Sequence, residues 1–125
     1  MAIHAFTRAI AAGQPVTLFG DGHSARDYTF IDDIIEGCFA ACERVQPGAY
    51  EIYNLGGSRT TSLSRLVELI GAAVGRAPVI QWKPDQPGDV PITFADVSKA
   101  ARDLAYAPQV GIEEGIRRFV EWFRA

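Results

Sequence analysis

Residues 16–33, VTLFGDGHSARDYTFIDD, contain the pattern on which the fold assignment depends. Four residues that favour a strand lead into Gly20-x-Gly22-x-x-Ala25, which matches the Gly-x-Gly-x-x-Gly/Ala pattern of dinucleotide-binding folds. In those folds the third small residue opens a helix, because the pyrophosphate rests on the helix N-terminus. Here Ala25 is followed by RDYTFI, whose residues favour extended structure. We therefore predict a turn between two strands at residues 20–25, with no cofactor bound there.

Helical and extended patterns are mixed along the rest of the chain. Helices are predicted over residues 2–12, 33–45, 63–74, 98–104 and 112–124. Strands are predicted over residues 16–19, 26–31, 49–57 and 79–82. Residues 83–91, KPDQPGDVP, contain three prolines and a glycine and predict a rigid connection. The pattern indicates one mixed α and β domain, of α/β or α+β class, over residues 1–125.

Two of these elements have side chains whose surroundings can be anticipated. Asp32 or Asp33 can cap the helix over residues 33–45. The apolar stripe of this helix is expected to face inward, and it consists of Ile34, Ile35, Cys38, Phe39 and Cys42. Buried free thiols are therefore predicted, since the spacing of four is not that of a Cys-x-x-Cys site. Residues 49–57, AYEIYNLGG, show no polar alternation and predict a strand covered on both faces.

Composition limits the classes of partner. The formal net charge is −3, and no run of Lys or Arg is present, so a nucleic acid or an anionic membrane is not an expected partner. No apolar segment approaches the roughly 20 residues that a membrane span requires. The N-terminal residues lack the pattern of a signal peptide, which predicts a cytoplasmic protein. His4 and His23 have no partners at ligand spacing, so neither a metal site nor a catalytic histidine is predicted.

Four segments in register resemble a known family. They are VTLFGDGHSARDYTFIDDIIEGCFAA, YNLGG, QPGDVPITFADVSKAARDLAYAP and GIEEGIRRFVEWF. Together they resemble the C-terminal, substrate-binding portion of the extended short-chain dehydrogenase/reductases. The likeness is greatest to NAD-dependent nucleotide-sugar epimerases of the UDP-glucuronate and UDP-glucose 4-epimerase types. The resemblance implies an α/β fold without the N-terminal Rossmann half.

The same resemblance implies that the reacting groups lie outside this sequence. Full-length members begin with Gly-x-x-Gly-x-x-Gly and continue to a catalytic Tyr-x-x-x-Lys pair. Lys83 and Lys99 are the only lysines, and the residues four positions before them are Val79 and Ala95. We therefore expect no catalytic residue and no NAD site in this chain, although the full-length family uses NAD. Met1 resembles an internal methionine of the family, so a truncated, split or partial product is expected.

The resemblance also implies a nucleotide-sugar site. Arg26 is expected to contact the diphosphate, and its guanidinium is a fork of donors suited to phosphate oxygens. The alternative is a surface ion pair of Arg26 with Asp27 or Asp32, which would contribute little. The backbone of three strand residues is implied to lie near the uracil: Thr17, Leu18 and Phe19.

Two residues of the rigid connection complete the implied site. Asp89 matches the family position that binds the ribose hydroxyls, and a carboxylate can accept two hydrogen bonds from a diol. The alternative is a solvated aspartate in a turn. Gln86 stands where several relatives place a second arginine, so diphosphate affinity is expected to be weaker.

Alternatives for function and partners remain open. The chain can be the UDP-sugar-binding portion of an epimerase or dehydratase, active only with a Rossmann half supplied in trans. It can instead be a non-catalytic module that binds nucleotide diphosphates, or a fragment that associates with itself. Without the Rossmann sheet, an open strand edge and an apolar helix face over residues 33–55 predict a homo-oligomer.

Overall fold

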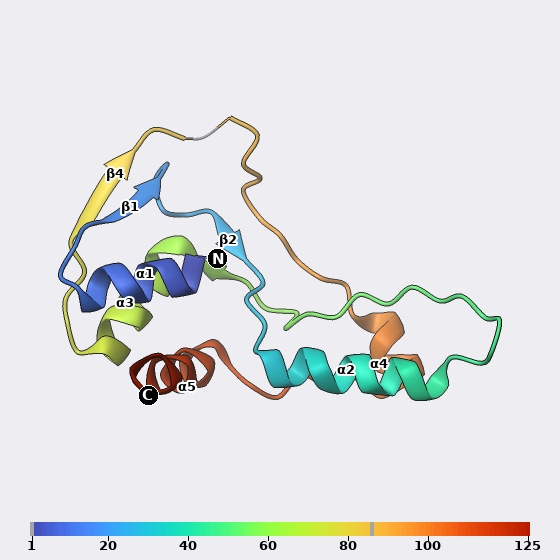
Figure 1. Ribbon diagram of the computed structural model, residues 1–125. Coiled ribbons are helices and arrows are strands. Elements are labelled where there is room, and N and C mark those ends of the chain that lie inside the picture. Colours follow the sequence, from blue (N-terminus) through green and yellow to red (C-terminus); the bar gives the residue numbers. More distant parts are fainter. Residues whose placement is uncertain (1, 86) are drawn as a thin grey trace.

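The computed structural model describes residues 2–85 and 87–125 and has a mixed α and β architecture (Figure 1). The helices are α1 (Ala2–Ala11), α2 (Ile31–Arg44), α3 (Leu63–Val74), α4 (Ser98–Leu104) and α5 (Ile112–Arg124). The strands are β1 (Val16–Phe19), β2 (Ala25–Arg26), β3 (Thr61–Ser62) and β4 (Ile80–Lys83). The predicted α/β class is confirmed, as is the existence of every predicted helix.

The strands form two small sheets. β1 pairs in parallel with β4, in a register that joins Val16 to Ile80 and Phe19 to Lys83. β2 pairs antiparallel with β3, where Arg26 lies opposite Thr61, and Ala25 also bridges to Ile92. The extended run predicted over residues 26–31 is therefore much shorter than expected, because β2 ends at Arg26.

The hydrophobic core lies where α1, α3 and α5 pack beside β1 (Figure 1). Its fully buried members are Ile10, Val16, Leu18, Leu66, Val67, Ile70, Ile116 and Val120. Local signals define α3: the Ser62 hydroxyl accepts the Arg65 amide at its start, and Gly75 ends it with a φ of 76°. The two ends of α3 therefore coincide with the helix predicted over residues 63–74.

The surroundings of α2 contradict two predictions. Phe30 is its N-cap and no side chain caps the helix, so neither Asp32 nor Asp33 has the expected capping role. The stripe expected to face inward is largely exposed: Phe39 is 68% accessible, and Cys38 and Cys42 are exposed. The prediction of buried thiols is therefore wrong. α2 packs on α4, and Ile34 is partly buried, while the other four members of the stripe remain exposed within the described chain.

The strand predicted at residues 49–57 is also absent from the described structure. This segment is extended but has no neighbouring strand, and Tyr50 is 82% exposed. Side-chain contacts hold it instead, since Lys99 Nζ donates to the Ile52 carbonyl at 3.0 Å. The Tyr106 hydroxyl donates to the Gly56 carbonyl at 3.0 Å. A strand needs a partner for its backbone groups, and residues 2–85 and 87–125 supply none here.

Candidate functional site

The turn at residues 20–24 joins β1 to β2, as predicted for a turn between two strands. Gly20 and Gly22 have φ values of 69° and 78°, which favour glycine. Gly22 also has no room for a side chain, because a Cβ there would lie 2.2 Å from Ser64 Oγ and 2.8 Å from the Trp82 ring. The glycines therefore serve the turn and the packing of Trp82 and α3.

β1 has one paired edge and one edge without a strand. At its two ends, the Val16 amide donates to the Val79 carbonyl at 2.8 Å and the Gly20 amide donates to the Lys83 carbonyl at 2.9 Å. Because backbone groups alternate in direction along a strand, the amides of Thr17 and Phe19 point away from β4. The β1–β4 sheet has only these two strands within the described chain. Leu18 is completely buried, and its amide lies on the side of β1 that faces β4, so Leu18 offers no group to a ligand.

Arg26 and Asp89 form an ion pair across 63 residues of sequence. The Arg26 Nη1 also donates to the Ala25 carbonyl at 2.9 Å and to the Pro91 carbonyl at 3.4 Å. The sequence offered Asp27 or Asp32 as an alternative ion-pair partner of Arg26. In the described structure both carboxylates accept hydrogen bonds from other groups instead. Two residues that the sequence predicted as ligands thus lie together.

A cleft of about 380 Å³ lies on the Asp89 side of this pair, and Arg26 is not among its lining residues. It is lined by Phe19, Asp21, His23, Ser24, Asp85, Asp89, Val90, Pro91 and Ile92. The end of β1 and Asp89 therefore share one cavity, while Gln86 lies outside the described residues. Burial raises the pKa of the nearby Tyr28 phenol, which the positive charge of Arg26 partly offsets. A hydrogen bond from the His23 amide lowers the pKa of Asp21, so this cleft wall is anionic at neutral pH.

Asp27, directly after β2, accepts hydrogen bonds from three backbone amides, a role that the sequence did not indicate. Its Oδ1 accepts the Gly57 amide at 2.9 Å, and its Oδ2 accepts the Ser58 amide at 3.0 Å and the Ala95 amide at 3.4 Å. One carboxylate thus joins three segments beside Arg26. A local pattern cannot reveal these partners, because they lie 30 to 68 residues away.

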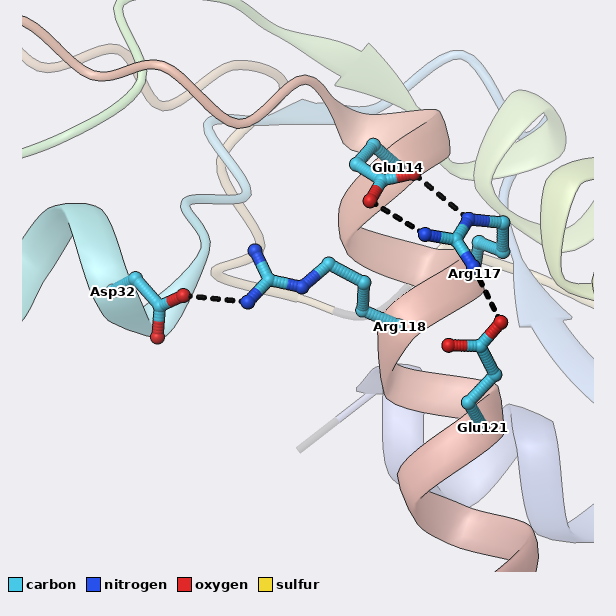
Figure 2. A network of polar contacts seen from close by, with 5 residues as sticks. All are labelled: Asp32, Glu114, Arg117, Arg118 and Glu121. Atoms are coloured by element: carbon cyan, nitrogen blue, oxygen red, sulfur yellow. Dashed lines mark hydrogen bonds and ion pairs between the residues drawn. The ribbon is translucent and has the colours of Figure 1, made fainter.

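Other polar groups have structural roles. Figure 2 shows Arg117 between Glu114 and Glu121 on α5, and Arg118 reaching Asp32 of α2 at 2.7 Å. His4 packs edge-on against the rings of Phe119 and Phe123. Among residues 2–85 and 87–125, no cluster of three His, Cys, Asp or Glu side chains could hold a metal ion. No helix in this part of the chain is long and apolar enough to cross a membrane.

Sequence relatives match almost the whole chain. The profile of the GDP-mannose 4,6-dehydratase family matches residues 1–119. A UDP-glucuronate 4-epimerase of Thermodesulfobacterium geofontis is 38% identical over 123 residues, which cover 98% of this chain and 37% of that protein. A probable UDP-glucuronate 4-epimerase of Rhizobium meliloti is 34% identical and is covered to 41%. The chain therefore spans about two fifths of the length of these curated relatives.

Solved structures agree with these matches. The UDP-glucose 4-epimerase of Thermotoga maritima, solved with UDP-glucose, has a TM-score of 0.88 and 35% identity; the match covers 99% of this chain and 39% of that one. The UDP-glucuronic acid 4-epimerase of Bacillus cereus, solved with UDP-glucuronic acid and NAD, has a TM-score of 0.87 and 31% identity, with coverages of 98% and 40%. The chain belongs to the GDP-mannose 4,6-dehydratase family, among the NAD-dependent nucleotide-sugar epimerases and dehydratases that its sequence resembles.

Proposed function

We propose that this chain is the nucleotide-sugar-binding portion of an epimerase or dehydratase, and that its ligand is a UDP-sugar. The observation that supports this most directly is the ion pair of Arg26 with Asp89, because Asp89 lines the cleft that the end of β1 also lines. Relatives of similar fold were solved with UDP-glucose and with UDP-glucuronic acid. Both ligands combine a diphosphate, a ribose and a uracil base.

Each part of that ligand has a counterpart in the site. The free amides of Thr17 and Phe19 suit the carbonyl groups of a uracil, while the buried Leu18 side chain holds β1 in place. The Arg26 guanidinium suits the diphosphate, because charge-assisted hydrogen bonds to phosphate are strong. The Asp89 carboxylate suits the ribose diol. Gln86 would add a hydrogen bond without charge, in the position that the sequence resemblance assigns to it.

Catalysis is proposed to require groups beyond these residues. The sequence contains no Tyr-x-x-x-Lys pair, and such a pair would supply the proton transfer and the lysine that holds the cofactor. In this proposal the chain binds and orients the nucleotide, while a complementary α/β portion supplies NAD and the reacting groups. The whole protein's activity would be epimerisation or dehydration of a nucleotide sugar.

The exposed face of α2 supports a further part of the proposal, which concerns association. We define the α2 face as Ile31, Ile35, Cys38, Phe39 and Cys42. These apolar side chains are exposed, and the extended segment beyond α2 leaves Tyr50 and Ile52 exposed as well. A continuous apolar surface of this kind marks an interface on soluble proteins. A second copy of the chain or the complementary α/β portion would cover it.

Calorimetric titration of the chain with UDP tests the binding proposal. We expect weak but measurable binding to the wild type. Arg26→Gln should lower the affinity about ten- to a hundredfold, because charged hydrogen bonds contribute about 1.5–3 kcal/mol. Arg44→Gln, at the last turn of α2, makes the same change of charge away from the cleft and should leave UDP affinity nearly unchanged. Equal affinities for the wild type and the Arg26 variant would contradict the proposal.

A further inference from the structure

A second cavity, of about 430 Å³, lies between the loop before β3 and the start of α5. Among the side chains that line it are Tyr28, Arg59, Thr60, Thr61, Arg65 and Glu113. Arg26 and Asp89 do not line this cavity, and the cleft beside Asp89 shares none of its residues. The cavity is therefore separate from the candidate nucleotide site.

The two arginines of this cavity are weakly engaged. Arg65 Nη1 lies 3.4 Å from Glu68 Oε2, and Arg65 Nη2 lies 3.6 Å from Glu113 Oε1. Both distances exceed the length of about 2.7–2.9 Å that is typical of a charge-assisted hydrogen bond. Arg59 forms no ion pair within residues 2–85 and 87–125. Guanidinium donors of both residues are therefore available to a ligand.

The charge of the lining favours an anion. The lining contains two guanidinium groups and one carboxylate, that of Glu113, so its net charge is positive. The cleft beside Asp89 has the opposite character, because the carboxylates of Asp21 and Asp85 also line it. A cavity lined by one sign of charge raises the local concentration of ligands of the other sign. The two sites therefore attract different groups.

Hydroxyl groups add further donors to the cavity. The Ser62 hydroxyl is already engaged at the start of α3, but those of Tyr28, Thr60 and Thr61 form no hydrogen bond within the described part of the chain. Burial raises the pKa of the Tyr28 phenol, so this group keeps its proton at neutral pH. A phosphate monoester offers three acceptor oxygens and a charge of about −1.5 to −2 at pH 7. A carboxylate has fewer oxygens and a smaller charge, so it suits this set of donors less well.

We propose that this cavity binds the phosphate group of a small phosphate monoester, through Arg59, Arg65 and the hydroxyl groups of Thr60 and Thr61. The volume lies within the range of about 300–1,000 Å³ that is typical of small-molecule sites, so the rest of a small metabolite fits beside the phosphate. The Arg65 side chain is 54% exposed, so the binding is weak and reversible. This inference goes beyond the proposed nucleotide site and does not depend on it.

NMR titration of the ¹⁵N-labelled chain with glucose 1-phosphate, inorganic phosphate and acetate, at constant ionic strength, tests the inference. Glucose 1-phosphate should cause saturable shifts in the amide signals of residues 59–62 and 111–113. Arg59→Gln and Arg65→Gln should each lower its affinity about tenfold, because each removes charged hydrogen bonds. The affinity should also fall as the pH is lowered through about 6, where the phosphate loses one negative charge. Acetate should bind at least about tenfold more weakly, since it lacks that charge.

Two pairs of variants serve as controls. Arg8→Gln makes the same change of charge on α1, outside the cavity, and should leave the affinity for glucose 1-phosphate nearly unchanged. Glu113→Gln removes the carboxylate from the lining and should raise that affinity about two- to fivefold. Glu114→Gln, at the next position and outside the lining, should raise it less.

Several results would overturn the inference. The amide shifts may not saturate, they may centre on Arg26 and Asp89, or Arg8→Gln may lower the affinity as much as Arg59→Gln does. Equal affinities for acetate and glucose 1-phosphate would also contradict it, as would binding of inorganic phosphate alone. Arg59 and Arg65 are exposed, so their variants should keep the fold, which circular dichroism checks. Titration of the wild type with UDP tests the proposed function separately, because neither arginine lines the cleft beside Asp89.

Discussion

The Asp33 carboxylate accepts the backbone amide of Gln109 at 2.8 Å, although the two residues are 76 positions apart. The second carboxylate oxygen accepts the Val110 amide at 3.1 Å. Asp33 is only 3% exposed, so these contacts form in the interior. One side chain in the first turn of α2 thus fixes the segment that leads into α5, and with it the relative placement of the two helices.

Replacing Asp33 with Asn should destabilise the protein by about 1–3 kcal/mol, because one buried amide donor loses its acceptor. Asp32→Asn is the matched control at the next position. Asp32 is 48% exposed and pairs with Arg118 on the surface, so its loss should cost less than about 1 kcal/mol. Urea unfolding followed by circular dichroism measures both values. Equal destabilisation of the two variants would contradict a special role for Asp33.

The sequence predicted the buried face correctly for those helices whose apolar stripe packs on the chain's own core. In α3 and α5 the stripe faces a partner within the chain, and the Ser62 cap of α3 is a local signal. The stripe of α2 carries the same periodicity, yet it is exposed, because periodicity shows that a face is apolar and does not identify what covers it. Residues 49–57 failed as a strand for a related reason, since a strand depends on a neighbour.

The sequence identified Arg26 and Asp89 as candidate site residues, but it did not predict that they pair with each other. An arginine at the junction of a loop and a strand and an aspartate in a proline-rich loop both suggest ligand contacts. Their ion pair spans 63 residues, and no local pattern encodes it. The same holds for Asp27, whose carboxylate joins segments that are distant in sequence. Long-range polar contacts arise from the fold, so they follow only after the fold is known.

Acid should weaken the network on α5 that Figure 2 shows. Hydrogen bonds from Arg117 lower the pKa of Glu114 below its usual value of 4.5. A carboxyl group with a lowered pKa stabilises the fold above its unfolded-state pKa, and this contribution is lost as the pH falls through the folded-state value. Glu114→Gln should therefore lower the melting temperature slightly at pH 7, and the difference from the wild type should shrink as the pH falls to 3.

Glu113→Gln serves as the control for that experiment. Glu113 is the neighbouring residue, and its contact with Arg65 is longer, at 3.6 Å. Its substitution should have a smaller effect at pH 7. If the melting temperature of Glu114→Gln differs from the wild type by the same amount at pH 3 and pH 7, the ion pair with Arg117 contributes no stability.

The chain alone should neither bind NAD nor catalyse epimerisation, dehydration or oxidation of a nucleotide sugar. The turn after β1 leads into β2 instead of a helix, so no helix N-terminus follows it to receive a pyrophosphate. The sequence also lacks a Tyr-x-x-x-Lys pair. Titration with NAD and activity assays with UDP-glucose and UDP-glucuronic acid test this expectation. Micromolar NAD affinity would overturn the assignment of residues 20–25 as a plain turn.

The α2 face should mediate association of the chain. Phe39, at the centre of the α2 face, is 68% exposed, and Ile35, one helical turn away, is 45% exposed. Water therefore contacts an apolar area that an interface would bury. Light scattering at micromolar concentration should give a mass above the 13.6 kDa of one chain. Phe39→Glu places a charge in this surface and should shift the mass toward the monomer. Trp122→Glu, at a residue of α5 that is 66% exposed, is the matched control and should leave the mass unchanged. A monomeric wild type would rule out self-association and leave a complementary portion as the partner that covers α2.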